Sequence, residues 1–123
     1  MNKGRRNWLS EVEGRLRNRL DCGIALMGAT PEVTDEFKGL ISDEMSTLQI
    51  ILDEEQECYD NTPESFETRR EISENAISSI EEAIDYLQEA YDNVDELLSG
   101  DITESDIEDS IESACDAISA AQE

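Results

Sequence analysis

The chain has 123 residues and a formal net charge of −23, with 32 acidic residues against 9 basic ones. A small soluble domain ordinarily carries a net charge of magnitude about 2 to 8. This acidic excess argues against direct binding to nucleic acid or to an anionic membrane, because both need clustered Lys and Arg. The length predicts a single domain over residues 1–123.

The cysteines and the hydropathy indicate a cytoplasmic protein with no membrane segment. Cys22, Cys58 and Cys115 are odd in number and far apart, so they predict no disulfide framework. Each lies near an apolar helical position, which predicts a small buried thiol. No apolar run approaches the ~20 residues that a membrane span needs, and no signal peptide is expected.

Two helices are expected in the first half of the chain. The first spans about 5–27, with apolar residues at helical spacing, and Gly28 follows it: Trp8, Val12, Leu16, Leu20, Ile24 and Met27. Thr30-Pro31-Glu32 is typical of a helix start, with Thr as N-cap and Pro in the first turn. The second helix should span about 32–59 and bury Val33, Phe37, Ile41, Met45, Leu48 and Leu52.

Two further helices are expected in the second half. Thr62-Pro63-Glu64 repeats the start pattern, so the third helix should span about 63–98 and end before Ser99-Gly100. The fourth should span about 104–121, opened by a capping box between Thr103 and Asp106. Since all connections are short, the predicted fold is all-α, an antiparallel bundle of about four helices with a long third helix.

The third helix separates apolar from acidic residues. Its apolar positions alternate steps of three and four, as in a heptad seam: Ile77, Ile80, Ile84, Leu87, Tyr91, Val94 and Leu98. Ala76, Ala83 and Ala90 lie beside the seam and would let another helix approach closely. At 100° per residue, the acids fall opposite the seam.

The acids of the fourth helix likewise lie opposite its apolar face. We call the two sets together the acidic stripe and predict it to be the partner-binding surface: Glu71, Glu74, Glu81, Glu82, Asp85, Glu89, Asp92, Glu96, Glu108, Asp109, Glu112 and Asp116.

Catalytic and cofactor motifs are missing from the sequence. There is no histidine, which removes the commonest general base and most zinc and haem sites. The segment 101–112 places oxygen ligands at some positions of a calcium-loop template, but Asp106 stands where the sharp turn needs Gly. A helix cap is therefore the preferred interpretation there. We expect no catalytic residue, no metal site and no cofactor, and hence no enzyme.

The basic residues cluster early in the chain. Arg15, Arg17 and Arg19 could contact an acidic partner, but we expect them to face the acids of the bundle itself. Arg69 and Arg70 are expected to pair with the end of the second helix.

The spacing of the carboxylates along the third helix is comparable to that of DNA phosphates. The eight acids from Glu71 to Glu96 cover ~38 Å of helix axis, about one per 5 Å. B-DNA presents a phosphate about every 3.4 Å along each strand. Mimicry of DNA is therefore one interpretation of the acidic stripe. Two other interpretations stay open: a merely solvated outer face, and a general adaptation to a salt-rich cell.

The segment DEEQECYDNTPES (53–65), followed by AIDYLQEAYDNVDEL, resembles a helical hairpin that recurs in small uncharacterised phage and prophage proteins. The resemblance covers about half of the chain. Thr62 stands where the pattern usually has Leu, and Tyr59 and Phe66 flank the turn and are expected to lock the hairpin. The resemblance implies a phage origin, and hence the cytoplasm of a bacterial host, but no established activity.

Small acidic phage proteins include inhibitors of host defence nucleases, anti-CRISPR proteins among them. The resemblance and the stripe together favour a non-enzymatic inhibitor that mimics DNA. Its partner would be a basic nucleic-acid-binding protein, such as a CRISPR effector nuclease. The alternative is a helical interaction module or homodimer that uses the heptad seam, with acids only for solubility.

Overall fold

A computed structural model describes residues 3–22, 31–100 and 103–122 of the chain. These residues form four helices and no strand: α1 (Lys3–Cys22), α2 (Pro31–Asn61), α3 (Glu67–Ser99) and α4 (Glu104–Ala121). The all-α prediction is confirmed. The predicted residues 23–27 of the first helix, together with Gly28 and Thr30, lie outside the described part of the chain.

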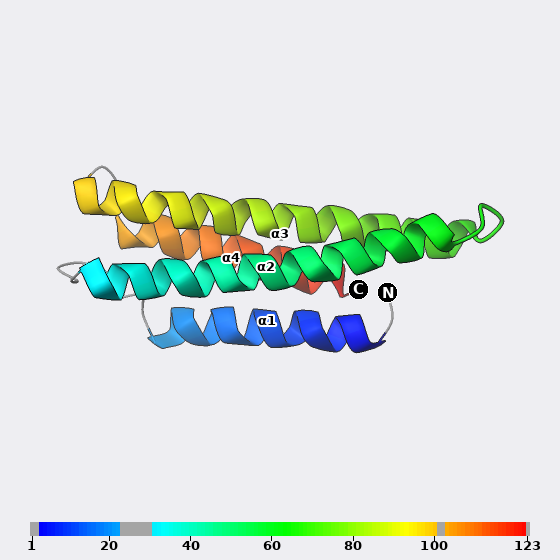
Figure 1. The fold of residues 1–123 in the computed structure, drawn as a ribbon, viewed down its shortest axis with the longest axis horizontal. Coiled ribbons are helices and arrows are strands. Elements are labelled where there is room, and N and C mark those ends of the chain that lie inside the picture. Colours follow the sequence, from blue (N-terminus) through cyan, green and yellow to red (C-terminus); the bar gives the residue numbers. More distant parts are fainter. Residues whose placement is uncertain (1–2, 23–30, 101–102, 123) are drawn as a thin grey trace.

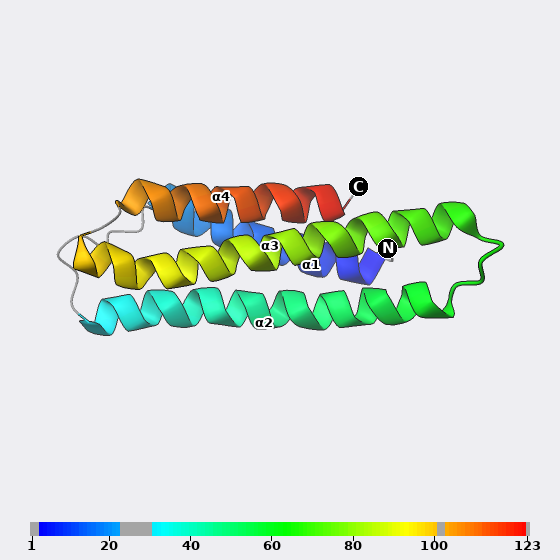
Figure 2. The ribbon, with the colours of Figure 1, turned by 90° about the horizontal axis from the view of Figure 1, so that it is seen from above.

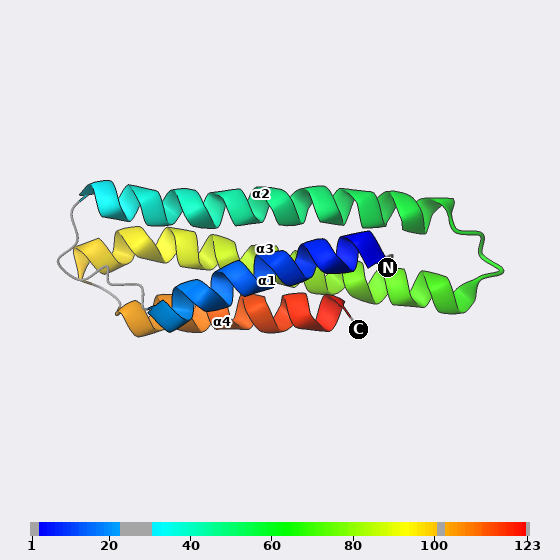
Figure 3. The same cartoon turned by 90° about the horizontal axis from the view of Figure 1, so that it is seen from below.

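The four helices form a ring in which each packs against two neighbours. α3 packs against α2 and α4, and α1 closes the ring by packing against the same two helices, so that α1 and α3 lie diagonally opposite (Figure 1). α2 and α3 are the longest helices, and their connected end projects beyond α1 and α4 (Figures 2 and 3). One long antiparallel hairpin is therefore supported along part of its length by two shorter helices.

The heptad seam of α3 lies inside this bundle. Ile80, Leu87 and Val94 are fully buried. The flanking Ala83 and Ala90 are fully buried as well, as expected where a neighbouring helix approaches closely. Ile84 and Tyr91 are only partly buried, so the chain's own helices cover most of the seam. The side chain of Leu98, the last predicted seam residue, lies outside the described ones.

The buried face of α2 differs from the predicted one. Val33 is 39% exposed rather than buried, whereas Thr34, Glu44 and Glu55 are buried. The buried positions follow a heptad pattern: Thr34, Phe37, Ile41, Glu44, Leu48, Ile51 and Glu55. The prediction placed apolar Val33, Met45 and Leu52 on this face because it excluded carboxylates.

Arginines of α1 allow the two glutamates of α2 to be buried. Arg15 Nε donates to Glu44 Oε1 at 2.8 Å and Arg15 Nη2 to Glu44 Oε2 at 3.1 Å. Arg5 Nε donates to Glu55 Oε2 at 2.8 Å. A buried carboxylate is tolerated when a charged hydrogen-bond donor reaches it. The two pairs also fix the antiparallel register of α1 on α2.

The predicted start of the third helix at residue 63 is wrong. Thr62 directly follows α2 and is attached to its last turn, since its hydroxyl donates to the Cys58 carbonyl oxygen at 2.7 Å and its N–H donates to the Tyr59 carbonyl oxygen at 3.1 Å. The Phe66 N–H donates to the Pro63 carbonyl oxygen at 2.9 Å, which makes residues 63–66 a separate turn. The Thr-Pro pattern therefore marks a connection here. α3 begins one turn later, at Glu67.

The other predicted boundaries agree with the structure. α2 begins at Pro31, and α4 spans 104–121 as predicted. The Thr103 N–H donates to Asp106 Oδ2 at 3.0 Å, so Asp106 acts in the cap of α4. Gly100 ends α3 in the left-handed conformation, with φ of 83°, which glycine adopts without steric strain.

The cysteine prediction holds for one of the two described thiols. Cys115 is fully buried, and its burial raises the pKa of the thiol to about 11. Cys58 is exposed, contrary to the prediction, because it lies on the outer side of α2. The side chain of Cys22 is not among the described ones.

Candidate protein-interaction surface

The α3 part of the acidic stripe forms the outward face of that helix. Because the seam residues point inward, the helical repeat places the acids on the opposite side. All eight are exposed: Glu71, Glu74, Glu81, Glu82, Asp85, Glu89, Asp92 and Glu96. The helix therefore presents acids on its outward face along nearly its whole length, with a gap between Glu74 and Glu81 where Ser78 is exposed.

The chain's own cations do not neutralise this face. All nine Lys and Arg residues lie in the described part of the chain, at positions 3 to 70. Among the described residues, none of the eight α3 acids of the stripe forms an ion pair with them. The α3 acid that does form one, Asp95, lies outside the stripe and contacts Lys38 at 3.2 Å.

The four acids of α4 divide between two sides of that helix. Asp109 lines a groove shared with α3, whereas Glu112 lies with Arg17 and Leu20 on the side facing α1. Asp116 is exposed and accepts a hydrogen bond from Arg17 Nη2 at 3.3 Å. Glu108 is only half-exposed. The structure therefore brings Asp109 to the α3 acids but turns Glu112 toward α1.

A groove between α3 and α4 joins acids from both helices. One section is lined by Tyr86, Glu89 and Asn93 of α3 and by Asp106, Asp109, Ser110 and Ser113 of α4. The next section is lined by Glu82, Tyr86, Ser113, Asp116, Ala117 and Ala120. Tyr86 lines both sections and is 38% exposed. We call this feature the Tyr86 groove.

Sequence reasoning missed Tyr86 and Asp106 as surface residues of this groove. Asp106 fills its predicted role in the cap of α4, and Tyr86, which lies outside the seam positions, has no predicted role. Tyr86 is separated from Glu82 by four residues and from Glu89 by three, which places all three on neighbouring turns of one face. That spacing could have identified the α3 side of the groove, but not its partner α4.

Arg15, Arg17 and Arg19 of α1 were all expected to contact acids of the bundle. The structure confirms this for the first two. Arg15 contacts Glu44, and Arg17 Nε donates to Glu13 Oε2 at 2.7 Å. The hydrogen bond to Glu44 raises the pKa of Arg15, and the one to Glu13 raises that of Arg17. Arg19 instead lies over the ring of Phe37, at 5.6 Å from its centroid.

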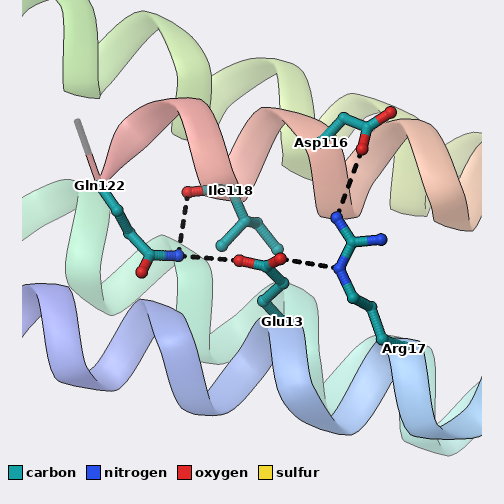
Figure 4. A network of polar contacts seen from close by, with 5 residues as sticks. All are labelled: Glu13, Arg17, Asp116, Ile118 and Gln122. Carbon is teal, nitrogen blue, oxygen red and sulfur yellow. Dashed lines mark hydrogen bonds and ion pairs between the residues drawn. The ribbon is translucent and has the colours of Figure 1, made fainter.

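A network of polar contacts attaches α1 to the end of α4. Gln122 Nε2 donates to Glu13 Oε1 at 3.0 Å and to the Ile118 carbonyl oxygen at 3.3 Å (Figure 4). Glu13 thus receives Gln122 on one oxygen and Arg17 on the other, and Arg17 reaches on to Asp116. The network engages Oδ1 of Asp116, although the side chain of this acid stays 71% exposed.

Arg70 holds the α2–α3 hairpin at its tip. Its Nη1 donates to the Thr62 carbonyl oxygen at 2.8 Å, and its guanidinium lies 4.3 Å from the centroid of Tyr59. This confirms the predicted contact of Arg70 with the end of the second helix. Arg69 lies over Phe66, which remains 50% exposed. Of the two aromatic residues that flank the turn, Tyr59 is therefore the one that joins α2 to α3, through Arg70.

Within residues 3–22, 31–100 and 103–122, no group of three or more Cys, Asp and Glu side chains is arranged to hold a metal ion. None of the described helices combines the length and the apolar character needed to cross a bilayer. Comparison of the chain with protein-family models, with curated proteins and with solved structures gave no match. Any functional inference therefore depends on the surface and on the resemblance of residues 53–65 described above.

Proposed function

We propose that the protein is a non-enzymatic inhibitor that occupies the basic nucleic-acid-binding channel of a partner protein by presenting a DNA-like acidic face. The single observation that carries the proposal is the α3 face, where eight exposed acids of the stripe have no ion pair with any Lys or Arg of the chain. The sequence resemblance to phage proteins makes a host defence nuclease, such as a CRISPR effector, the preferred partner.

The physical argument is electrostatic. A stiff helix that carries about one carboxylate per 5 Å of axis produces a field comparable in linear density to that of a phosphate strand. A channel that evolved to bind a duplex would be attracted to this face at long range without any base contact. Because the seam of α3 is buried in the bundle, the helix keeps its shape while its outer face is bound.

The alternative of a module assembled through the heptad seam has less support. Such an assembly needs an apolar stripe that faces solvent, but Ile80, Leu87 and Val94 have no exposed surface. Apolar assembly persists at high salt, whereas a charge-driven complex dissociates. Sedimentation of the protein at about 0.05 and 1 M salt separates the two: a salt-resistant dimer would favour the module.

The proposal is tested by affinity capture from a nuclease-treated bacterial lysate, with elution in salt steps and identification of the bound proteins. We expect a basic nucleic-acid-binding protein that is released at moderate salt and displaced by duplex DNA. The variant Asp85→Lys/Glu89→Lys/Asp92→Lys should bind it about tenfold less tightly or worse, because the reversed charges oppose the channel.

A matched variant on α2 controls for net charge. Asp43→Lys/Glu54→Lys/Glu57→Lys changes three exposed acids by the same six charges but leaves α3 intact. We expect this variant to retain most of the binding. If both triple variants lose binding equally, or if duplex DNA fails to displace the captured protein, mimicry by the α3 face is wrong.

A further inference from the structure

Four of the five Phe and Tyr rings in the chain carry a cation over their face. The distances from the cation to the ring centroid are 5.6 Å for Arg19 on Phe37, 4.3 Å for Arg70 on Tyr59, 5.5 Å for Arg69 on Phe66 and 4.8 Å for Lys38 on Tyr91. The fifth ring belongs to Tyr86. Although all nine Lys and Arg residues are described, none is placed over it.

The Tyr91 site shows how α3 holds a cation. Lys38 Nζ lies 4.8 Å from the centroid of Tyr91 and 3.2 Å from Oδ1 of Asp95, one helical turn further along. The ring supplies a face of negative potential and the carboxylate supplies a counter-charge. Together they hold an ammonium group that belongs to a different helix, α2.

The Tyr86 groove repeats this arrangement without a cation. Glu89 is three residues after Tyr86 and lines the groove with it, and Glu82, four residues before Tyr86, lines the next section. Across the groove, α4 contributes Asp109. An exposed ring is thus flanked by carboxylates from two helices. No described Lys or Arg is among the residues that line the groove, although Arg17 reaches Asp116 at its second section.

We propose that the Tyr86 groove receives an arginine side chain of the basic partner, with the guanidinium plane over the ring of Tyr86 and its N–H groups directed to Glu89 and Asp109. This proposal rests on the proposed function for the identity of the partner and adds to it the side chain that is recognised. It also makes α4 part of the binding surface, whereas mimicry of DNA by the α3 acids alone would not involve α4.

Arginine suits this groove better than lysine does. A guanidinium is planar and weakly hydrated, so it stacks on an aromatic face while its edge still donates to carboxylates on either side. An ammonium is a compact, strongly hydrated group that cannot present separate edges to two helices. Basic channels of nucleic-acid-binding proteins contain both residues, and the groove should select the arginines among them.

The test uses two peptide probes, blocked octa-arginine and blocked octa-lysine, titrated into the full-length protein by calorimetry at low salt. We expect octa-arginine to bind more tightly than octa-lysine to the unmodified protein. Tyr86→Leu should weaken octa-arginine binding about threefold, the scale of an exposed cation–π contact, and should reduce the preference for arginine. Tyr86→Phe keeps the ring and should bind as the unmodified protein does.

A pair of charge variants tests the position of the site. Glu89→Gln/Asp109→Asn removes the two groove carboxylates, whereas Asp43→Asn/Glu54→Gln removes two exposed carboxylates of α2. The groove pair should weaken octa-arginine binding more than the α2 pair does. Equal losses, or a Tyr86→Leu variant that binds octa-arginine as tightly as the unmodified protein, would overturn the proposal.

These outcomes are separable from those of the lysate experiment. Tyr86→Leu changes no charge, so a DNA-like α3 face could still capture a basic protein if the groove did not select arginine. Conversely, loss of octa-arginine binding in Tyr86→Leu would identify the groove even if no DNA-displaceable protein were captured. Circular dichroism of each variant shows whether the helices are intact.

Discussion

Removing one partner of the Arg15–Glu44 ion pair should have very different effects depending on which partner is removed. The Arg15 side chain is 47% exposed, whereas that of Glu44 is only 8% exposed. In Arg15→Met the carboxylate of Glu44 remains buried without its two hydrogen bonds. In Glu44→Leu the guanidinium of Arg15 can turn to water. The structure thus predicts an asymmetry rather than a single energy for the pair.

The magnitudes follow from the burial. Breaking a buried pair by removing the group that satisfies the buried charge costs about 3–5 kcal/mol, and the half-exposed setting of Arg15 reduces this to about 2–3 kcal/mol for Arg15→Met. Glu44→Leu should change the free energy of unfolding by less than about 1 kcal/mol, because apolar burial offsets the lost pair. The double variant should resemble Glu44→Leu, since no buried charge is stranded.

Urea denaturation at 25 °C and neutral pH, monitored by circular dichroism, measures all three variants. Arg6→Met serves as a control, because Arg6 is an exposed arginine of the same helix with no ion pair among the described residues. The reasoning fails if Glu44→Leu destabilises as much as Arg15→Met does, or if the double variant is no more stable than Arg15→Met.

Three further predictions concern packing, pH and salt. Leu87→Ala should lower the free energy of unfolding by about 3 kcal/mol, because Leu87 is fully buried in the seam. Asp85→Ala, at an exposed position, should change it by less than about 0.5 kcal/mol. Equal effects of the two variants in urea denaturation would contradict the buried seam. Burial raises the pKa of Cys115 from 9.0 to about 11, so the folded state keeps the proton longer than the unfolded state, and roughly 2–3 kcal/mol of stability present below pH 9 should be lost by pH 11. Urea titrations across that pH range should show a slope that Cys115→Ala reduces, and an unchanged slope would assign the loss to other groups, such as Lys38, whose pKa is raised by its hydrogen bond to Asp95. Raising NaCl from about 0.05 to 0.5 M should increase the thermal midpoint, because salt screens the repulsion within a chain of net charge −23, and a lower midpoint would show that the internal ion pairs outweigh it.

The sequence predicted the fold well where apolar spacing decides it, and less well where polar residues are buried. The seam of α3 and the fourth helix were predicted because their buried positions are apolar at regular intervals. The face of α2 was misplaced because Glu44 and Glu55 occupy core positions, and their burial depends on arginines 29 and 50 residues away in sequence. Pairing over such distances leaves no local signal in a single sequence.

Only the α3 part of the candidate surface was predictable from the sequence. The outward face of α3 follows from helical periodicity within one helix, so all eight of its acids are exposed as expected. The contribution of α4 depends on how that helix is rotated against α3, which periodicity does not determine. Asp109 therefore joins the groove while Glu112 faces α1, although both lay on one predicted face.

The placement of the cations explains why the α3 face stays acidic. Arg5 and Arg15 are bound to buried glutamates, Arg17 to α1 and α4, and Arg70 to the hairpin turn. Moving any of them to the α3 face would remove a contact that holds α1 or the hairpin in place. Since no base follows Arg70 in the sequence, α3 and α4 have no local counter-charge beyond the first turn of α3. The fold therefore uses its few cations for assembly, and the repulsion among the eight α3 acids of the stripe is left to solvent ions, as it would be to a basic partner. Binding of a basic partner would then relieve this self-repulsion as well as form new contacts. Because salt screens both interactions, added salt should raise the free energy of unfolding and lower the affinity for the partner.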